Sequence, residues 1–259
     1  MANFLNPVPT WAIMLASGLL LFAFSELGFQ LGRARGISKD GHDPSFILEG
    51  AAFTLLALLL GFSFSMALGR YDARRSTLMR EANAIATTFF RAELLDDKTA
   101  AEVRENLRAY VADRIAFARA DAQPQQRAIA DAESLQVQRT LWELADRSAQ
   151  KDPHSTLVPL FLTSLNDTIN LSTEQRAVLS NHIPDVVIVW LLLIALIAAG
   201  MLGYGFGREG KRALVFKAFF ALMVALVFGL VLDLDRPQRG IIRVNLAPLE
   251  SVAQMMDRR

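Results

Sequence analysis

The sequence contains no cysteine and only three histidines in 259 residues. Without cysteine, the chain cannot form disulfides, thiolate nucleophiles or cysteine-based zinc and iron–sulfur sites. The histidines lack metal-ligand spacing, and the chain has no Walker-type glycine loop, HExxH motif or GxSxG motif. We therefore predict a protein that is not an enzyme and holds no cofactor and no metal.

An excess of charge of either sign is also missing. The chain has 27 basic and 26 acidic residues, a formal net charge of +1, so composition does not point to a nucleic-acid partner. Lysine is scarce, at five of the 27 basic residues. Compositional bias and selection for the fixed geometry of the guanidinium group both account for this scarcity.

Apolar residues, by contrast, are abundant and lie in long runs. They make up 53% of the chain, against about 45–50% in soluble domains. Segments 50–69 and 186–207 are uncharged over 20 and 22 residues, enough to cross a hydrocarbon core of about 30 Å. Two further segments are apolar but for a few polar residues: 11–31, with Glu26 and Gln30, and 213–232, with Lys217 near an end where it can snorkel. We predict four transmembrane helices, the first of them retained rather than cleaved.

Between the two helix pairs lies a long insert with almost no β pattern. Its apolar residues recur with the 3.6-residue period of amphipathic helices. The predicted fold is therefore an all-α membrane protein with a helical extramembrane insert between the second and third transmembrane helices. The predicted divisions are 1–69 with transmembrane helices 1 and 2, 70–184 as the helical extramembrane domain, 185–232 with transmembrane helices 3 and 4, and 233–259 as a C-terminal tail.

Within the insert, local motifs predict where helices begin. Residues 71–95 should continue the second membrane helix without a break. The capping box TAAE predicts an N-cap at Thr99, and Pro124 and Pro153 each predict a helix start. A second capping box, STEQ at 172–175, predicts a short helix that leads into the third membrane helix.

Small and charged residues inside the apolar segments are candidates for packing or function. Ala199, Gly203 and Gly207 recur every four residues, a pattern typical of close helix packing in membranes. Glu26 is the one carboxylate within an apolar span. It either lies at the interface, at the end of a helix terminating near Leu27, or acts as a pore-side or inter-helix ligand.

Charges gather where two of the apolar segments end. Arg70, Arg74 and Arg75 follow the second segment, and Asp233 and Asp235 follow the fourth. Helices two and four leave the bilayer on the same side, so we predict that these aspartates pair with these arginines. The alternatives are an interfacial arginine belt and solvated flanking charges.

The second apolar segment carries a resemblance. LGF at 60–62, then seven residues, then RY at 70–71 resembles the second transmembrane helix of bestrophins. The stretch RYDAR at 70–74 is similar to the bacterial form. Over nearly its full length, with "DLDRPQRGIIRV" near its end, the chain resembles a bacterial bestrophin-like family of unknown function.

This resemblance implies a homo-oligomeric, pentameric ion channel, with its own copies, membrane lipid and inorganic ions as partners. The second helix would line the pore, with Thr54, Leu58 and Phe62 at the hydrophobic constriction, although Thr54 departs from the apolar pattern. Asp233 and Asp235 alone stand where animal bestrophins carry a calcium-binding acidic run, so no calcium site is implied. The resemblance also implies a bacterial inner membrane, with the insert and both termini in the cytoplasm, whereas loop charges lean slightly the other way.

Two other functions fit the same pattern. The insert could be the working part of a non-conducting sensor or scaffold that the membrane helices anchor. A small-molecule transporter is less favoured, because no internal repeat relates the two helix pairs.

Overall fold

A computed structural model describes residues 8–36, 45–120, 123–236 and 242–258. Every regular element in these ranges is helical, which confirms the predicted all-α fold. The elements are α1 (Thr10–Ala34), α2 (Ser45–Arg91), the 3-10 turn η1 (Ala92–Leu94), α3 (Asp97–Arg119), α4 (Pro124–Lys151), α5 (Val158–Ser180), α6 (Asp185–Arg208), α7 (Leu214–Asp235) and α8 (Ala247–Asp257).

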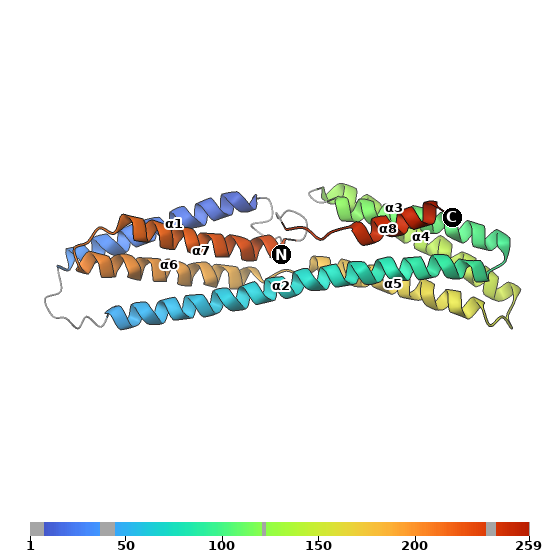
Figure 1. Cartoon of the computed structure of the whole chain (residues 1–259), viewed down its shortest axis with the longest axis horizontal. Coiled ribbons are helices and arrows are strands. Elements are labelled where there is room, and N and C mark those ends of the chain that lie inside the picture. The colour runs from blue at the N-terminus through green and yellow to red at the C-terminus, as the bar shows by residue number, and fades with distance from the viewer. Residues whose placement is uncertain (1–7, 37–44, 121–122, 237–241, 259) are drawn as a thin grey trace. The chain divides into compact units, whose positions relative to one another are not determined.

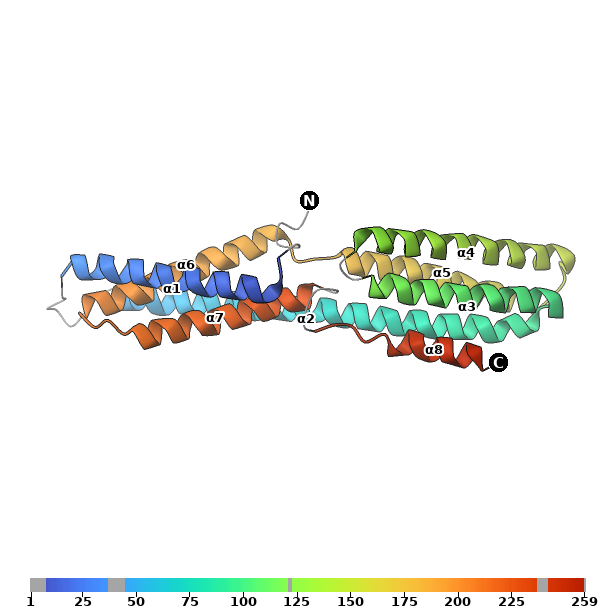
Figure 2. The same ribbon diagram turned by 90° about the horizontal axis from the view of Figure 1, so that it is seen from above.

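The chain divides into two compact units. The membrane unit comprises Met1–Arg70, His182–Arg236 and Gly240–Ile242, and so contains α1, the first part of α2, α6 and α7. The helical unit comprises Tyr71–Asn181, Pro237–Arg239 and Arg243–Arg259, and contains the rest of α2 with η1, α3, α4, α5 and α8. Both ribbon views show the helices of each unit running side by side (Figure 1, Figure 2).

Four helices are long and apolar enough to cross a membrane, which confirms the predicted spans. They are α1, α2, α6 and α7, and α2 continues past its apolar part to Arg91 without interruption. No residue within this continuation breaks the helix, because it contains neither proline nor glycine after Gly69.

Within the membrane unit, α1 and α6 pack at backbone distance. A Cβ atom on Gly203 would overlap the carbonyl oxygen of Ser25 and lie 2.7 Å from its carbonyl carbon. Gly207 is equally crowded, with a Cβ atom 2.9 Å from the amide nitrogen of Arg33, and Ala199 is fully buried. The predicted small-residue stripe therefore lies on the packed face of α6, which α1 covers.

The helical unit has an apolar core. Leu107, Val111, Leu141, Phe161 and Leu165 are all fully buried in it. Helix α8 adds Leu249, Val252 and Met256 to the same core, so part of the predicted tail is a packed helix.

Of the four helix starts predicted from local motifs, three are wrong and one is confirmed. Helix α3 begins at Asp97, so Thr99 is not an N-cap; its hydroxyl donates to the Asp96 carboxylate at 2.9 Å. Helix α5 begins at Val158 rather than Pro153, because Asp152 and Ser155 first form a turn. Helix α4 does begin at the predicted proline, Pro124.

The second capping box also lies inside a helix. Ser172 is fully buried in the middle of α5, and its hydroxyl donates to the carbonyl of Ile169 at 2.8 Å. A serine whose hydroxyl is satisfied by the preceding turn does not cap. Helix α5 is therefore one continuous helix through 172–175.

Candidate functional site

Helix α2 presents an apolar face that the described part of its own chain leaves uncovered. Thr54, Leu58 and Phe62, at i, i+4 and i+8, are all exposed, with Leu58 54% and Phe62 63% accessible. Leu56 and Ala67, on the other side of the helix, are buried against the membrane unit. Only 17% of the most apolar part of α2 is buried, against 33–39% for the other three spans. This face must therefore meet either lipid or another protein.

Where α2 leaves the membrane unit, Arg70 contacts the end of α7. Arg70 Nη1 lies 3.2 Å from Asp235 Oδ1, one of the pairings expected from the sequence. The Ile183 backbone N–H donates to both Asp235 carboxylate oxygens, at 3.0 and 3.1 Å. His182 Nδ1 lies 3.1 Å from the Asp235 carbonyl oxygen. Asp235 therefore joins α2, α7 and the residues just before α6, and the last two partners gave no sign in the sequence.

The other two arginines of the cluster differ in environment. Arg74 is fully buried in the helical unit, where it donates to the carbonyl oxygens of Val178 (3.3 Å) and Asn181 (2.9 Å). These carbonyls end α5, where a helix dipole favours a cation. Arg75 is exposed.

Two more charged residues fix the chain around the end of α7. The carboxylate of Asp233 accepts the Ile242 backbone N–H at 2.9 Å. Arg236 Nη1 donates to the carbonyl of Val8 at 2.7 Å. The charges of the motif DLDR thus hold neighbouring backbone segments of the membrane unit in place.

Glu26 lies in the interior of α1 and pairs with α7. Helix α1 continues to Ala34, so Glu26 does not mark a helix end. Its carboxylate lies 2.5 Å from Lys217 Nζ and 3.7 Å from Arg212. Lys217 is fully buried rather than snorkelling, and its ammonium sits 4.5 Å above the ring of Phe29. The pair therefore joins the membrane helices α1 and α7.

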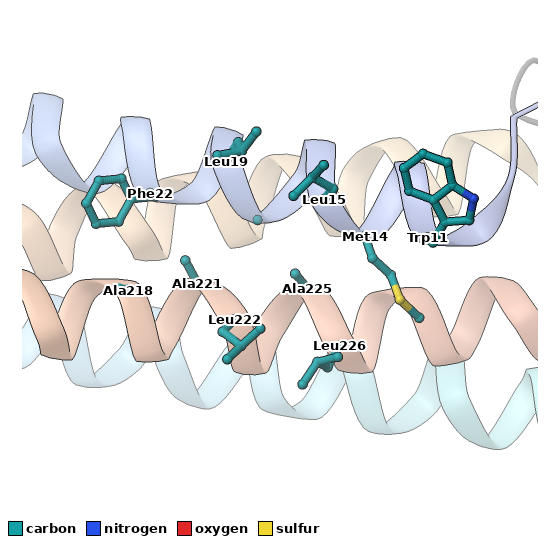
Figure 3. A pocket seen from close by; sticks show the side chains of 11 residues that line it. Trp11, Met14, Leu15, Leu19, Phe22, Ala218, Ala221, Leu222, Ala225 and Leu226 are labelled. Carbon is teal, nitrogen blue, oxygen red and sulfur yellow. The ribbon is translucent and has the colours of Figure 1, made fainter.

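An apolar groove of about 390 Å³ runs between α1 and α7 (Figure 3). Gly18, Ala221 and Ala225 leave room for it, since larger side chains there would fill the space. Trp11, 68% exposed, stands at one end, and none of the lining residues is charged. The groove therefore suits a hydrocarbon chain.

These features define a class of protein: an all-helical membrane protein whose second span continues into an extramembrane helical bundle. No cluster that could bind a metal occurs among the residues that the structure describes. The bestrophin-like domain model matches residues 48–249, most of the chain. The chain therefore belongs to the bestrophin-like domain family.

Solved structures share the fold at low sequence identity. A bacterial bestrophin homologue from Klebsiella pneumoniae superposes with a TM-score of 0.68 over 95% of each chain, at 14% identity. Two single-residue variants of that homologue give TM-scores of 0.70 over 95% of this chain and 96% of theirs, at 12% identity, and 0.71 over 96% of both, at 13%. No curated protein sequence matches this chain. Identities this low relate the folds alone.

Proposed function

We propose that this chain is a subunit of a bestrophin-like ion channel whose pore is lined by α2. The observation that carries the proposal is the exposed face of Thr54, Leu58 and Phe62. If copies of α2 surround an axis, this face becomes a narrow apolar ring. Such a ring blocks ions by excluding water, and small widening lets water and ions return.

A pore of this kind requires several copies, because one helix cannot enclose an axis. We take the copy number, five, from the family resemblance, together with a bacterial inner membrane and a cytoplasmic location for the helical unit and both termini. The partners are then identical chains, the surrounding lipid and inorganic ions. A closed ring of identical subunits uses the same two surface patches at every interface.

Two of the three arginines at the exit of α2 have their charge compensated within the chain, and Arg75 is exposed. Arg70, a predicted pore-mouth cation, is paired with Asp235, and Arg74 is buried against backbone carbonyls. Neither is an uncompensated charge available to attract anions. Ion preference is therefore an outcome of the flux measurement below rather than part of the proposal.

The experiment is ion flux from liposomes that contain the purified protein. We expect measurable flux of a small ion and a several-fold increase for Phe62→Ala, since truncation widens the ring. Phe219→Ala is the matched control, because Phe219 is 62% exposed on α7; its flux should equal that of the parent. A monomer by light scattering in detergent, or sealed vesicles with parent and Phe62→Ala protein alike, would reject the pore.

Sealed vesicles with an intact oligomer would instead support the non-conducting scaffold. The observation that favours this rival is the helical unit itself, which has its own buried core and is continuous with a membrane span through α2. Truncation at Phe62 would then leave both flux and assembly unchanged.

We also propose that a lipid acyl chain occupies the groove between α1 and α7. The groove is apolar throughout and lies on two membrane-spanning helices, where hydrocarbon is the surrounding solvent. Ala221→Leu, which fills the groove, should reduce the lipid retained per chain in native mass spectrometry. Val215→Leu, at a 78% exposed position outside the groove, should not. Equal retention by both variants would reject the site.

A further inference from the structure

A second hollow of the membrane unit lies on the other flank of α1, between α1 and α6. Its volume is about 410 Å³, and it shares no lining residue with the groove between α1 and α7. Ala12 and Ala16 leave room for it on α1. Farther along the same helix, Gly28 and Gly32 lie directly against the backbone of α6. The hollow therefore opens where glycine no longer holds the two helices together.

The lining of this hollow carries a carboxylate. Asp185 is the one charged residue among the described residues that line it. It is partly exposed and is the first residue of α6, directly before the uncharged run 186–207. Its position in the sequence therefore puts the carboxylate at the boundary between the head groups and the hydrocarbon core.

The Asp185 carboxylate has no counter-ion within the ranges that the structure describes, where it forms neither a hydrogen bond nor an ion pair. The positive end of the α6 dipole favours a carboxylate at this position but supplies no cation. Arg236 reaches the same region through Val8, whose carbonyl accepts from Arg236 Nη1 at 2.7 Å. However, Arg236 is 7% exposed and does not line the hollow. The charge of Asp185 is therefore open to a ligand.

The hollow extends from Asp185 into the apolar part of the membrane unit. On α6 its lining reaches Leu192, seven residues beyond Asp185, which is about 10 Å along the helix. One leaflet is about 15 Å deep, half of a hydrocarbon core of about 30 Å. Phe228, which also lines the hollow, lies seven residues before the end of α7 and so at a similar depth. A hydrocarbon chain can therefore lie in the hollow while a polar head group stays at Asp185.

We propose that this hollow binds a phospholipid with a primary ammonium head group, as in phosphatidylethanolamine, with the ammonium on the Asp185 carboxylate. A primary ammonium brings both a positive charge and N–H donors, and the unpaired carboxylate can accept both. A choline head group has no N–H donor and is recognised by aromatic side chains, whereas Phe228 lies deep in the hollow. The head group of phosphatidylglycerol carries only negative charge and would be repelled.

This selectivity distinguishes the hollow from the groove between α1 and α7, whose lining is uncharged (Figure 3). That groove suits any acyl chain, whereas the hollow between α1 and α6 selects by head group. The proposal holds whether or not the protein conducts ions.

The first test is native mass spectrometry of the full-length protein with equal amounts of phosphatidylethanolamine and phosphatidylglycerol of the same acyl chains. The parent should retain phosphatidylethanolamine with a preference of about fivefold, as expected of a good ion pair at a partly exposed site. Asp185→Asn should abolish the preference; asparagine keeps the shape of the side chain and is favourable near a helix N-terminus.

The matched control is Asp72→Asn, which removes the same charge from an exposed position on α2, two residues after Arg70. Its preference should equal that of the parent. An unchanged preference in Asp185→Asn would overturn the proposal. An equal loss in both variants would overturn it too, because the lipid would then respond to net charge alone.

Filling each space in turn separates the two lipid sites. Ala16→Leu narrows only the hollow between α1 and α6, so it should reduce the retained phosphatidylethanolamine and the preference together. Ala221→Leu fills only the groove between α1 and α7, so it should reduce the total lipid and leave the preference intact. If Ala221→Leu removes the preference and Ala16→Leu keeps it, the ammonium lipid occupies the other groove and the present proposal is wrong.

The second readout is the thermal midpoint in detergent with added lipid. A ligand that binds the folded state stabilises it, so phosphatidylethanolamine should raise the midpoint of the parent by about 2–4 °C. Phosphatidylcholine of the same acyl chains should raise it less, and Asp185→Asn should respond equally to both lipids. Equal stabilisation of the parent by the two lipids would overturn recognition of the ammonium by Asp185.

Discussion

Alanine at Gly203 should disrupt the contact between α1 and α6. Its Cβ atom would lie 2.7 Å from the Ser25 carbonyl carbon and 3.0 Å from the Phe29 amide nitrogen. Non-bonded carbon atoms prefer about 3.5–4.0 Å, so the helices must separate by about 1 Å. The opposing atoms are backbone, so no side-chain rotation relieves the overlap. Overpacking costs about 1–3 kcal/mol, and separation also loosens contacts along both helices, so we expect about 3 kcal/mol.

The assay is the thermal midpoint of the detergent-solubilised protein, followed by size-exclusion chromatography after heating. About 3 kcal/mol corresponds to a drop of about 6–12 °C. Gly200→Ala is the matched control on α6, because its Cβ atom would come no closer than an ordinary 3.9 Å to the Phe24 carbonyl oxygen. Gly207→Ala should behave like Gly203→Ala. If Gly203→Ala and Gly200→Ala have the same thermal midpoint, the close approach of α1 and α6 is refuted.

The same melting assay checks three further predictions. Glu26→Gln leaves the buried ammonium of Lys217 without its carboxylate and should lower the free energy of unfolding by about 3 kcal/mol. Adding Lys217→Met to this variant should recover most of that loss. No recovery would contradict a direct pair. Arg70→Met should lower the free energy of unfolding by about 1 kcal/mol, and Asp235→Ala should lower it by about 2–3 kcal/mol. The difference is expected because the Asp235 carboxylate also accepts two hydrogen bonds from the Ile183 backbone N–H. Equal losses would argue against that role of Asp235. Burial and, to a smaller extent, the nearby carboxylate of Glu133 raise the pKa of Asp113, so its ionised form destabilises the fold as pH rises above about 4. Asp113→Asn should therefore raise the thermal midpoint slightly at pH 7 and leave it unchanged at pH 4. An effect of equal size at both pH values would contradict this prediction.

The number and order of the membrane-spanning helices were easier to predict than the residues at which individual helices begin. The four spans followed from length and the absence of charge, which depend on the solvent rather than on neighbours. The predicted N-cap Thr99 lies three residues past the observed N-cap Asp96, because capping-box sequences also occur inside helices. The helix start predicted at Pro153 is five residues early, because Asp152 and Ser155 first form a turn. Helix α8 was missed because its burial depends on the core that it joins.

For the candidate site, the sequence was enough to predict which residues take part, but only the tertiary structure shows which residues they contact. Spacing alone put Thr54, Leu58 and Phe62 on one helix face, and small residues at Gly203 and Gly207 on another, because both follow from the helical period. Which arginine meets Asp235, and that Glu26 meets Lys217, depend on residues 165 and 191 positions apart being brought together. Such pairings depend on how the helices pack, because the sequence offers each of these residues several oppositely charged candidates in similar local surroundings.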